Sequence, residues 1–153
     1  MKEKVCFAAS LGGHLEEISK LDAIRERYDS FLLTERGEFN ELKFCDHVIY
    51  VNQINRKERL FVPKFFFLFW VSLWVLLKEK PDIIISSGAL VTYPICIWAK
   101  LIGKRVIYIE SFARVDTPSL TGRLMYRVAD LFIVQWQDLL AYFPKAVYAG
   151  GIF

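Results

Sequence analysis

A short apolar run that turns through two glycines into a helical pattern constrains the fold of this chain more than any other feature. After the run, Gly12 and Gly13 lead directly into His14 and an amphipathic segment. Glycine has no Cβ, so the backbone here can take a positive φ, and an anionic group can approach the free amides at the helix start. The pattern predicts a strand, a phosphate-sized loop and a helix. An ordinary strand-to-helix turn with an exposed histidine explains it equally well, so the rest of the chain has to decide.

The same order of strand and helix recurs along the whole chain. Apolar, β-branched runs predict strands, and apolar residues at three- and four-residue steps predict helices. We expect strands at 5–9, 31–34, 47–51, 82–86, 105–109, 131–134 and 146–148, helices at 15–28, 65–77, 92–102, 120–129 and 136–143, and a loop with a short helix at 35–46. No repeat, linker or low-complexity tract interrupts them. The sequence therefore predicts an α/β protein, with a single Rossmann-like domain over residues 1–153 and a mostly parallel sheet.

Bulk charge, cysteines and histidines narrow the classes of function. The net charge is only +3, so we expect no nucleic-acid partner. Cys6, Cys45 and Cys96 lie far apart and in no Cys-x-x-Cys arrangement, which indicates a reducing compartment and no disulfide framework. His14 and His47 lie on different segments, and neither has zinc-ligand spacing to a cysteine. We therefore expect no metal and no cofactor.

One segment is far more apolar than the rest of a chain that is already 54% hydrophobic. Residues 65–77 form a helical stretch that is apolar nearly all round, and basic residues flank it on both sides. This stretch reaches only about 20 Å as a helix, whereas a bilayer core is about 30 Å thick, so we expect it not to span. It predicts a membrane-interface helix at about 61–79. Its proposed membrane residues are Phe65, Phe66, Phe69, Trp70 and Trp74. The alternative is a crossover helix buried against the sheet and a partner.

Polar and small residues follow several of the predicted strands. In open parallel sheets, ligands bind outside the carboxyl ends of the strands, near the point where the strand order reverses. The loop with Gly12, Gly13 and His14 and the loop with Ser87 and Gly88 are both expected at that edge. Further along it we expect Glu110, Arg114, Gln135 and Gly150. Core packing does not explain a polar crevice built from separate loops, so functional use of this edge is favoured.

Several of these segments resemble a known family. The loop 10–14 resembles the glycine-glycine-histidine turn that opens the acceptor-side half of two-domain GT-B glycosyltransferases, including the peptidoglycan lipid II synthase. The segments 110–115, 129–130, 134–136 and 148–151 resemble the membrane-anchoring subunit of the split N-acetylglucosaminyltransferase that extends dolichol-diphosphate-linked sugar, together with its bacterial relatives in capsule and exopolysaccharide synthesis. This Alg14-like resemblance covers residues 4–153 in the family's order. It implies a fold equivalent to the N-terminal half of a GT-B glycosyltransferase.

The resemblance also implies a function. The chain would be the acceptor-side, membrane-associating subunit of a two-component inverting glycosyltransferase, inactive or weakly active alone. A separately encoded subunit would bind the nucleotide-sugar, and the acceptor would be a polyprenyl-diphosphate-linked saccharide of cell-surface polysaccharide synthesis, at the cytoplasmic face of the membrane. The alternative is a non-catalytic membrane scaffold that only recruits and activates its partner. A stand-alone nucleotide-binding enzyme is disfavoured, because the turn does not match Gly-x-Gly-x-x-Gly.

Residue roles follow from the resemblance and from side-chain chemistry. His14 has the pKa range and the position of a general base, and Glu110 is the second candidate. The acceptor diphosphate would contact Gly12, Gly13, Ser87, Gly88 and Arg114. An ion pair between Glu110 and Arg114 that fixes a loop is the structural alternative. The partner-binding residues would be Gln135, Trp136, Gly150, Ile152 and Phe153.

Overall fold

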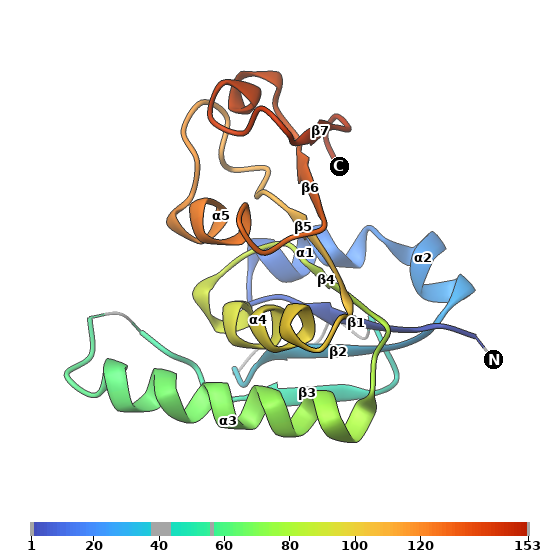
Figure 1. Ribbon diagram of the computed structural model, residues 1–153, viewed down its shortest axis with the longest axis vertical. Coiled ribbons are helices and arrows are strands. Elements are labelled where there is room, and N and C mark those ends of the chain that lie inside the picture. Colours follow the sequence, from blue (N-terminus) through green and yellow to red (C-terminus); the bar gives the residue numbers. More distant parts are fainter. Residues whose placement is uncertain (1, 38–43, 56, 153) are drawn as a thin grey trace.

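A parallel sheet forms the framework of the computed structural model, which describes residues 2–37, 44–55 and 57–152 (Figure 1). The strand order is β3-β2-β1-β4-β5-β6-β7, and every neighbouring pair is parallel. The order reverses between β1 and β4, so their carboxyl ends flank the switch point. The strands are β1 (Lys4–Ala8), β2 (Asp29–Glu35), β3 (Val48–Val51), β4 (Ile83–Ser86), β5 (Arg105–Ile109), β6 (Leu131–Val134) and β7 (Val147–Tyr148).

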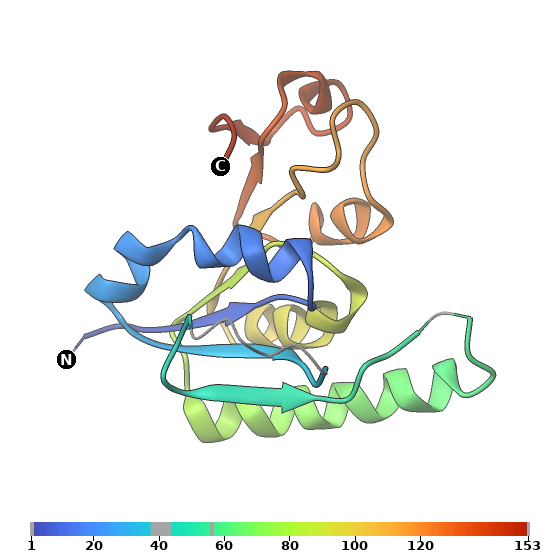
Figure 2. The ribbon, with the colours of Figure 1, turned by 180° about the vertical axis from the view of Figure 1, so that it is seen from behind.

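Helices cover both faces of the sheet, which explains the continuous apolar runs of its central strands. Val5 and Phe7 of β1 belong to a core on one face, and Cys6 and Ala8 belong to a core on the other; all four are fully buried. The first face is covered by α1 (Gly13–Ser19) and α2 (Asp22–Arg27), and the second by α3 (Phe61–Glu79), α4 (Tyr93–Leu101) and α5 (Leu120–Met125) (Figures 1 and 2).

The expected single helix over 15–28 is wrong, because the structure divides it into α1 and α2. The amides of Lys20 and Leu21 donate to carbonyls three residues back instead of four, to Glu17 O at 3.2 Å and Ile18 O at 3.0 Å. This tighter turn ends α1, and α2 starts a new direction after Leu21. The apolar residues keep helical spacing across the break, so the sequence pattern does not reveal that α1 and α2 are separate helices.

Other helix boundaries also differ from the expectation. The segment expected at 92–102 contains the 3₁₀ turn η1 (Leu90–Thr92) followed by α4, and the segment at 136–143 holds only the 3₁₀ helix η2 (Gln137–Ala141). Helix α5 ends early because the chain must enter β6: Asp130 N donates to Val106 O at 2.8 Å, and Val106 N donates to the Asp130 carboxylate at 2.9 Å. The helix expected within 35–46 falls partly on 38–43, outside the described residues.

Helix α3 runs along the sheet beside β3 and α4 (Figures 1 and 2). Its 19 residues correspond to about 28 Å, so the length of about 20 Å expected from residues 65–77 is wrong. The expectation that the helix does not span a bilayer rested on that shorter length and loses its support. Pro63 is compatible with the longer helix because it lies in the first turn. The indole N–H of Trp98 on α4 donates to Phe69 O at 2.9 Å, which ties the two helices together.

Candidate functional site

The loops after β1 and β4 are joined at the switch point by two reciprocal hydrogen bonds. His14 Nδ1 lies 2.9 Å from Ser87 O, and the Ser87 hydroxyl donates to His14 O at 2.8 Å. Gly12 and Gly88 have φ values of +79° and +124°, in the region that glycine adopts without a Cβ clash. The structure therefore brings together four of the predicted diphosphate and base residues, and two glycines make their loop conformations possible.

The hydrogen bond to Ser87 fixes the chemistry of the His14 ring. A carbonyl oxygen only accepts, so Nδ1 carries the proton, and the other ring nitrogen, Nε2, has a free lone pair. Burial lowers the pKa of His14; the hydrogen bond to Ser87 opposes this shift, and the charge of Arg114 adds to it. The ring also packs on Gly88, where a Cβ would lie 2.8 Å from His14 Cε1. His14 is thus held as a neutral imidazole in one tautomer.

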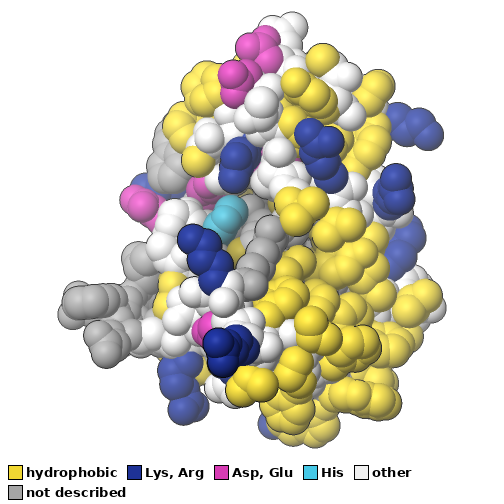
Figure 3. Space-filling view, turned by 90° about the vertical axis from the view of Figure 1, so that its left-hand side faces the viewer, with side chains coloured by type: hydrophobic (Ala, Val, Ile, Leu, Met, Phe, Trp, Pro, Cys, Tyr) yellow, Lys and Arg dark blue, Asp and Glu magenta, His cyan; other side chains and the backbone are white. Residues whose placement is uncertain are grey.

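His14 and Arg114 line the same cavity, whose volume is about 350 Å³. It lies at the carboxyl edge of the sheet, the side of the molecule that faces the viewer in Figure 3. Among the described residues, Arg114 forms no salt bridge with a carboxylate, so its guanidinium is available to an anion. The cavity is lined by His14, Ala89, Ser111, Ala113, Arg114, Ser119, Leu120 and Thr121.

Glu110 lies beneath this cavity and does not line it. Its side chain is 1% exposed; Oε1 accepts from Ser111 N at 3.1 Å, and Oε2 has no hydrogen-bond partner in the described part of the chain. Burial raises the pKa of Glu110, and neighbouring Ser119 opposes the shift. The carboxylate packs against α5, where a Cβ on Gly122 would come within 1.6 Å of Oε2. The ion pair between Glu110 and Arg114, the structural alternative to their functional roles, is not among the salt bridges of the described residues.

Glu17 is a residue of this region that the sequence analysis missed. Its buried carboxylate accepts hydrogen bonds from the Ser111 hydroxyl at 2.9 Å, Phe112 N at 3.1 Å and the Gln135 side chain at 3.4 Å. Burial raises the pKa of Glu17 against the effect of these three donors. A weak signal was present, because Glu17 lies four residues before Leu21, at the margin of the apolar stripe. Glu17 therefore anchors the loop that carries Arg114 into the cavity.

The predicted partner-binding residues form a packed C-terminal segment. Gln135 is 3% exposed: its amide group donates to Glu110 O at 3.0 Å and its oxygen accepts from Ile152 N at 2.8 Å. Trp136 is half-buried against Phe112 and donates to Phe112 O at 2.7 Å. Gln135 therefore acts inside the chain, whereas Trp136, Gly150 and Ile152 keep partly exposed surface. Phe153 lies outside the described residues.

The predicted membrane residues of α3 fall into two groups. Phe66, Trp70 and Trp74 are 66%, 70% and 56% exposed, whereas Phe65 and Phe69 are partly buried and contact each other edge to face. Figure 3 shows a broad hydrophobic surface over α3 and α4, beside the carboxyl edge of the sheet. By length and composition α3 is able to cross a membrane, and 22% of its most apolar window is buried inside the protein. One face of this apolar helix packs on the core, and the face with Phe66, Trp70 and Trp74 is exposed.

The comparisons with known proteins identify the family. Residues 42–152 match the family described as "Oligosaccharide biosynthesis protein Alg14 like". The chain belongs to this family. A mouse (Mus musculus) relative named "UDP-N-acetylglucosamine transferase subunit ALG14" is 42% identical over 93 residues, which are 57% of this chain and 43% of the mouse protein. The Schizosaccharomyces pombe relative of the same name is 40% identical over 75 residues, 46% of this chain and 36% of that protein. The chain spans less than half the length of these curated relatives.

Solved structures support the fold of this Alg14-like chain. MurG of Acinetobacter baumannii superposes with a TM-score of 0.73 at 18% identity, over 89% of this chain and 42% of MurG. UDP-N-acetylglucosamine 2-epimerase of Rickettsia bellii gives a TM-score of 0.78 at 13% identity, over 99% of this chain and 46% of the epimerase. These neighbours have the GT-B fold. The expected single Rossmann-like domain, equivalent to the N-terminal half of a GT-B glycosyltransferase, is confirmed.

Potential metal-ligating side chains are scattered over the described part of this Alg14-like domain. Within the ranges that the structure describes, no three His, Cys, Asp or Glu residues are placed to hold a metal ion. The three cysteines, Cys6, Cys45 and Cys96, are free and buried. Burial raises the pKa of Cys96 to about 12, so its thiol stays protonated at neutral pH. The polar side chains that line the switch-point cavity are those of His14, Ser111, Arg114, Ser119 and Thr121.

Proposed function

We propose that this chain is the acceptor-side, membrane-associating subunit of a two-component inverting glycosyltransferase. The observation that carries the proposal is the switch-point cavity, where His14, held in one tautomer, and Arg114, which has no salt bridge among the described residues, meet between glycine-containing loops. Family membership and relatives named as transferase subunits support the same assignment. The acceptor would be a polyprenyl-diphosphate-linked saccharide of cell-surface polysaccharide synthesis, and the relatives' name makes UDP-N-acetylglucosamine the first donor to test.

The residues of the cavity suit the transfer step. The acceptor hydroxyl attacks the anomeric carbon of the donor sugar as the bond from that carbon to the nucleotide diphosphate breaks, and His14 Nε2 takes the hydroxyl proton. Arg114 would bind the acceptor diphosphate through charge-assisted hydrogen bonds. The amides of Gly12 and Gly13 and the loop with Ser87 and Gly88 would complete that contact. Glu110 lies too deep to touch a ligand in this conformation, so His14 is the base that we propose.

The donor site would belong to a separately encoded subunit. The chain has the fold of one GT-B half, and a complete GT-B enzyme binds its nucleotide-sugar with the other. Trp136, Gly150 and Ile152 retain partly exposed surface near the C-terminal end, which suits contact with that subunit. Phe153, the last of the proposed contact residues, lies outside the described residues. We place the complex at the cytoplasmic face of the membrane, as a peripheral or monotopic protein, because α3 presents exposed aromatic side chains.

The test is reconstitution of this chain with the nucleotide-sugar-binding subunit and a polyprenyl-diphosphate-linked acceptor. His14→Ala should lower kcat by about 10²–10⁴, the usual contribution of general base catalysis, while the complex stays assembled. The acid limb of the wild-type kcat/KM profile should lie below pH 6.5, because the pKa of His14 is lowered and the base is lost only when the imidazole is protonated. Normal turnover by His14→Ala would refute the catalytic role and leave the alternative, a scaffold that recruits and activates the partner.

A further inference from the structure

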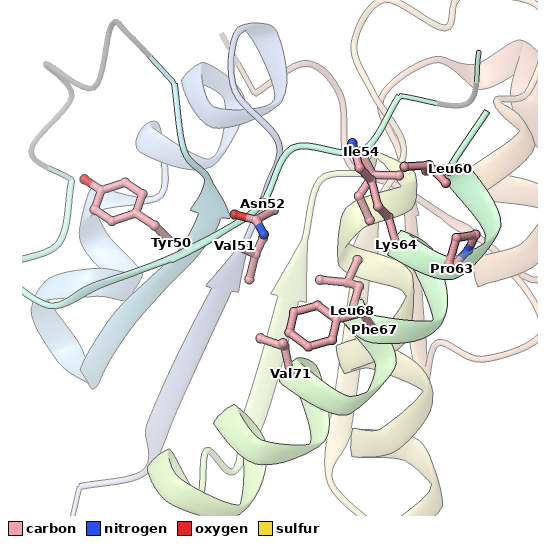
Figure 4. A pocket seen from close by; sticks show the side chains of 10 residues that line it. All are labelled: Tyr50, Val51, Asn52, Ile54, Leu60, Pro63, Lys64, Phe67, Leu68 and Val71. Carbon is pink, nitrogen blue, oxygen red and sulfur yellow. The ribbon is translucent and has the colours of Figure 1, made fainter. Parts of the chain in front are cut away.

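A second hollow lies between β3 and the first half of α3, apart from the cavity that His14 lines (Figure 4). Its volume is about 550 Å³, within the range of small-molecule sites. Val51 and Leu68 are buried at its base, at 4% and 3% exposure, and Leu60 and Phe67 are exposed at its rim. We call it the β3–α3 groove; it is lined by Tyr50, Val51, Asn52, Ile54, Leu60, Pro63, Lys64, Phe67, Leu68 and Val71.

The lining of the groove suits a hydrocarbon chain. Most of its walls are carbon, and its charged side chain, Lys64, is paired with Glu58. Figure 4 shows Phe67, Leu68 and Val71 on the side of α3 that faces β3. An apolar base below an exposed apolar rim favours a flexible, uncharged chain that enters from outside the protein.

The groove is continuous with the aromatic face of α3. Phe67 lines the groove and is 61% exposed, and Phe66 and Trp70 beside it on the helix are more exposed still. A lipid held by that face therefore reaches the groove without crossing a charged surface. Trp70 and Trp74, with Lys78 next to the Trp74 ring at 4.7 Å, have the composition of a membrane-interface surface.

The groove and the cavity lie at the same edge of the sheet. The groove contains Tyr50 and Val51 at the carboxyl end of β3, and the cavity is lined by residues that follow β1, β4 and β5. In the order β3-β2-β1-β4-β5, these elements are two to four strand spacings from β3. With about 4.8 Å per spacing, that is about 10–20 Å. One amphiphile with an anionic head and an apolar chain is able to occupy both.

We propose that the β3–α3 groove binds the head-group end of the acceptor's polyprenyl chain, beyond its first isoprene unit, while the diphosphate occupies the cavity with His14 and Arg114. This inference rests on the proposed function and adds to it the lipid subsite. A protein segment is the less suitable occupant, because the exposed surface beside the groove combines tryptophan and lysine as a lipid interface does.

The first test blocks the groove from each wall, with Val71→Trp on α3 and Ile54→Trp after β3. Both side chains are partly buried in the groove, and Val62→Trp is the matched control because Val62 is exposed on the same helix and does not line it. In the reconstituted two-chain enzyme, each blocking variant should raise KM for the polyprenyl acceptor about tenfold, equivalent to two lost methylene contacts. KM for an acceptor with the same head group and a short alkyl chain should not change.

The outcome separates this inference from the proposed function. If correctly folded Val71→Trp and Ile54→Trp enzymes keep the wild-type preference for the long chain, the groove is not the lipid subsite although the transferase assignment stands. Failure of the blocking variants to assemble with the catalytic subunit, while Val62→Trp assembles, would likewise overturn the inference and identify the groove as a protein interface.

A second measurement does not depend on turnover. A polyprenyl diphosphate with a photoreactive group on its third isoprene unit, added to the purified chain in detergent micelles, should label the residues Asn52 or Val71 themselves, as located by fragment-ion sequencing of the labelled peptides. Excess unlabelled polyprenyl diphosphate should remove the label. Labelling confined to Trp70 and Trp74 would overturn the groove as the subsite, and absence of any competed labelling would contradict acceptor binding itself, and with it the proposed function.

Discussion

Replacing Glu17 with alanine should destabilise the protein by about 3 kcal/mol. The carboxylate accepts hydrogen bonds of 2.9 Å from the Ser111 hydroxyl and 3.1 Å from Phe112 N inside the protein. Hydrogen bonds to a charged group contribute about 1.5–3 kcal/mol each, and the longer contact to Gln135 adds less. For a domain of this size, a loss of about 3 kcal/mol corresponds to a decrease in Tm of about 6–12 °C.

The isosteric change Glu17→Gln tests the charge separately. Burial raises the pKa of Glu17 above its ordinary value of 4.5, so the folded state binds this proton more tightly than the unfolded state. The stability from this group is therefore complete below pH 4.5 and is lost as pH rises through the raised pKa. Relative to Glu17→Gln, the wild type should lose free energy of unfolding over that window, because glutamine does not titrate. Glu35 and Glu110 also have raised pKa values, but they are present in both proteins.

Urea denaturation at several pH values measures both effects, and Glu16→Ala is the control. Glu16 precedes Glu17 on α1 and is exposed, so its removal should change the free energy of unfolding by less than about 0.5 kcal/mol. Equal stability of the Glu16→Ala and Glu17→Ala proteins would refute the anchoring role of Glu17. A difference between wild type and Glu17→Gln that does not vary with pH would refute the assigned direction of its pKa shift.

Three further predictions follow from the same structure. Gly88→Ala should lower kcat at least tenfold, because the new Cβ would lie 2.8 Å from His14 Cε1 and the φ of residue 88 is +124°. A kcat and a pH–rate profile identical to those of the wild type would contradict this prediction. Deletion of residues 150–153 should abolish co-purification with the nucleotide-sugar-binding subunit, and retained binding would exclude the tail as a docking element. Changing the exposed aromatic residues Phe66, Trp70 and Trp74 to serine should move the protein from the membrane fraction to the soluble fraction in flotation assays. An unchanged distribution would indicate that protein covers this face of the helix.

The sheet was predictable because its strands are buried on both faces. Such strands have continuous apolar, β-branched sequences, which are easy to recognise. The expected bounds of β5 and β6 agree with the structure residue for residue. Helix ends were less predictable, since they depend on where the chain must return to the sheet. The Asp130 contacts that shorten α5 join residues 24 apart in sequence, and no local pattern reports such a pairing.

The loops of the candidate site were predictable from the sequence, but the buried residue that holds the Arg114 loop in place was not. Gly12, His14, Ser87 and Gly88 follow strands that flank the reversal of strand order, so sheet topology alone places them together. Arg114 joins them through the loop after β5. Glu17 was missed because two consecutive glutamates at a helix start already suit the helix dipole, and only the tertiary fold shows that one of them is buried.

The catalytic and scaffold roles make different demands on this edge of the sheet. A scaffold requires the α3 surface and a docking segment, and neither needs a buried carboxylate at the switch point. Burial of Glu17 and Glu110 disfavours their charged forms, as their raised pKa values indicate, so ionisation of either side chain lowers the stability of the fold. The fold nevertheless keeps Glu17 on the loop that presents Arg114, opposite a histidine held in one tautomer. Retention of such a costly arrangement beside a cavity favours a role in the chemistry of transfer over simple recruitment.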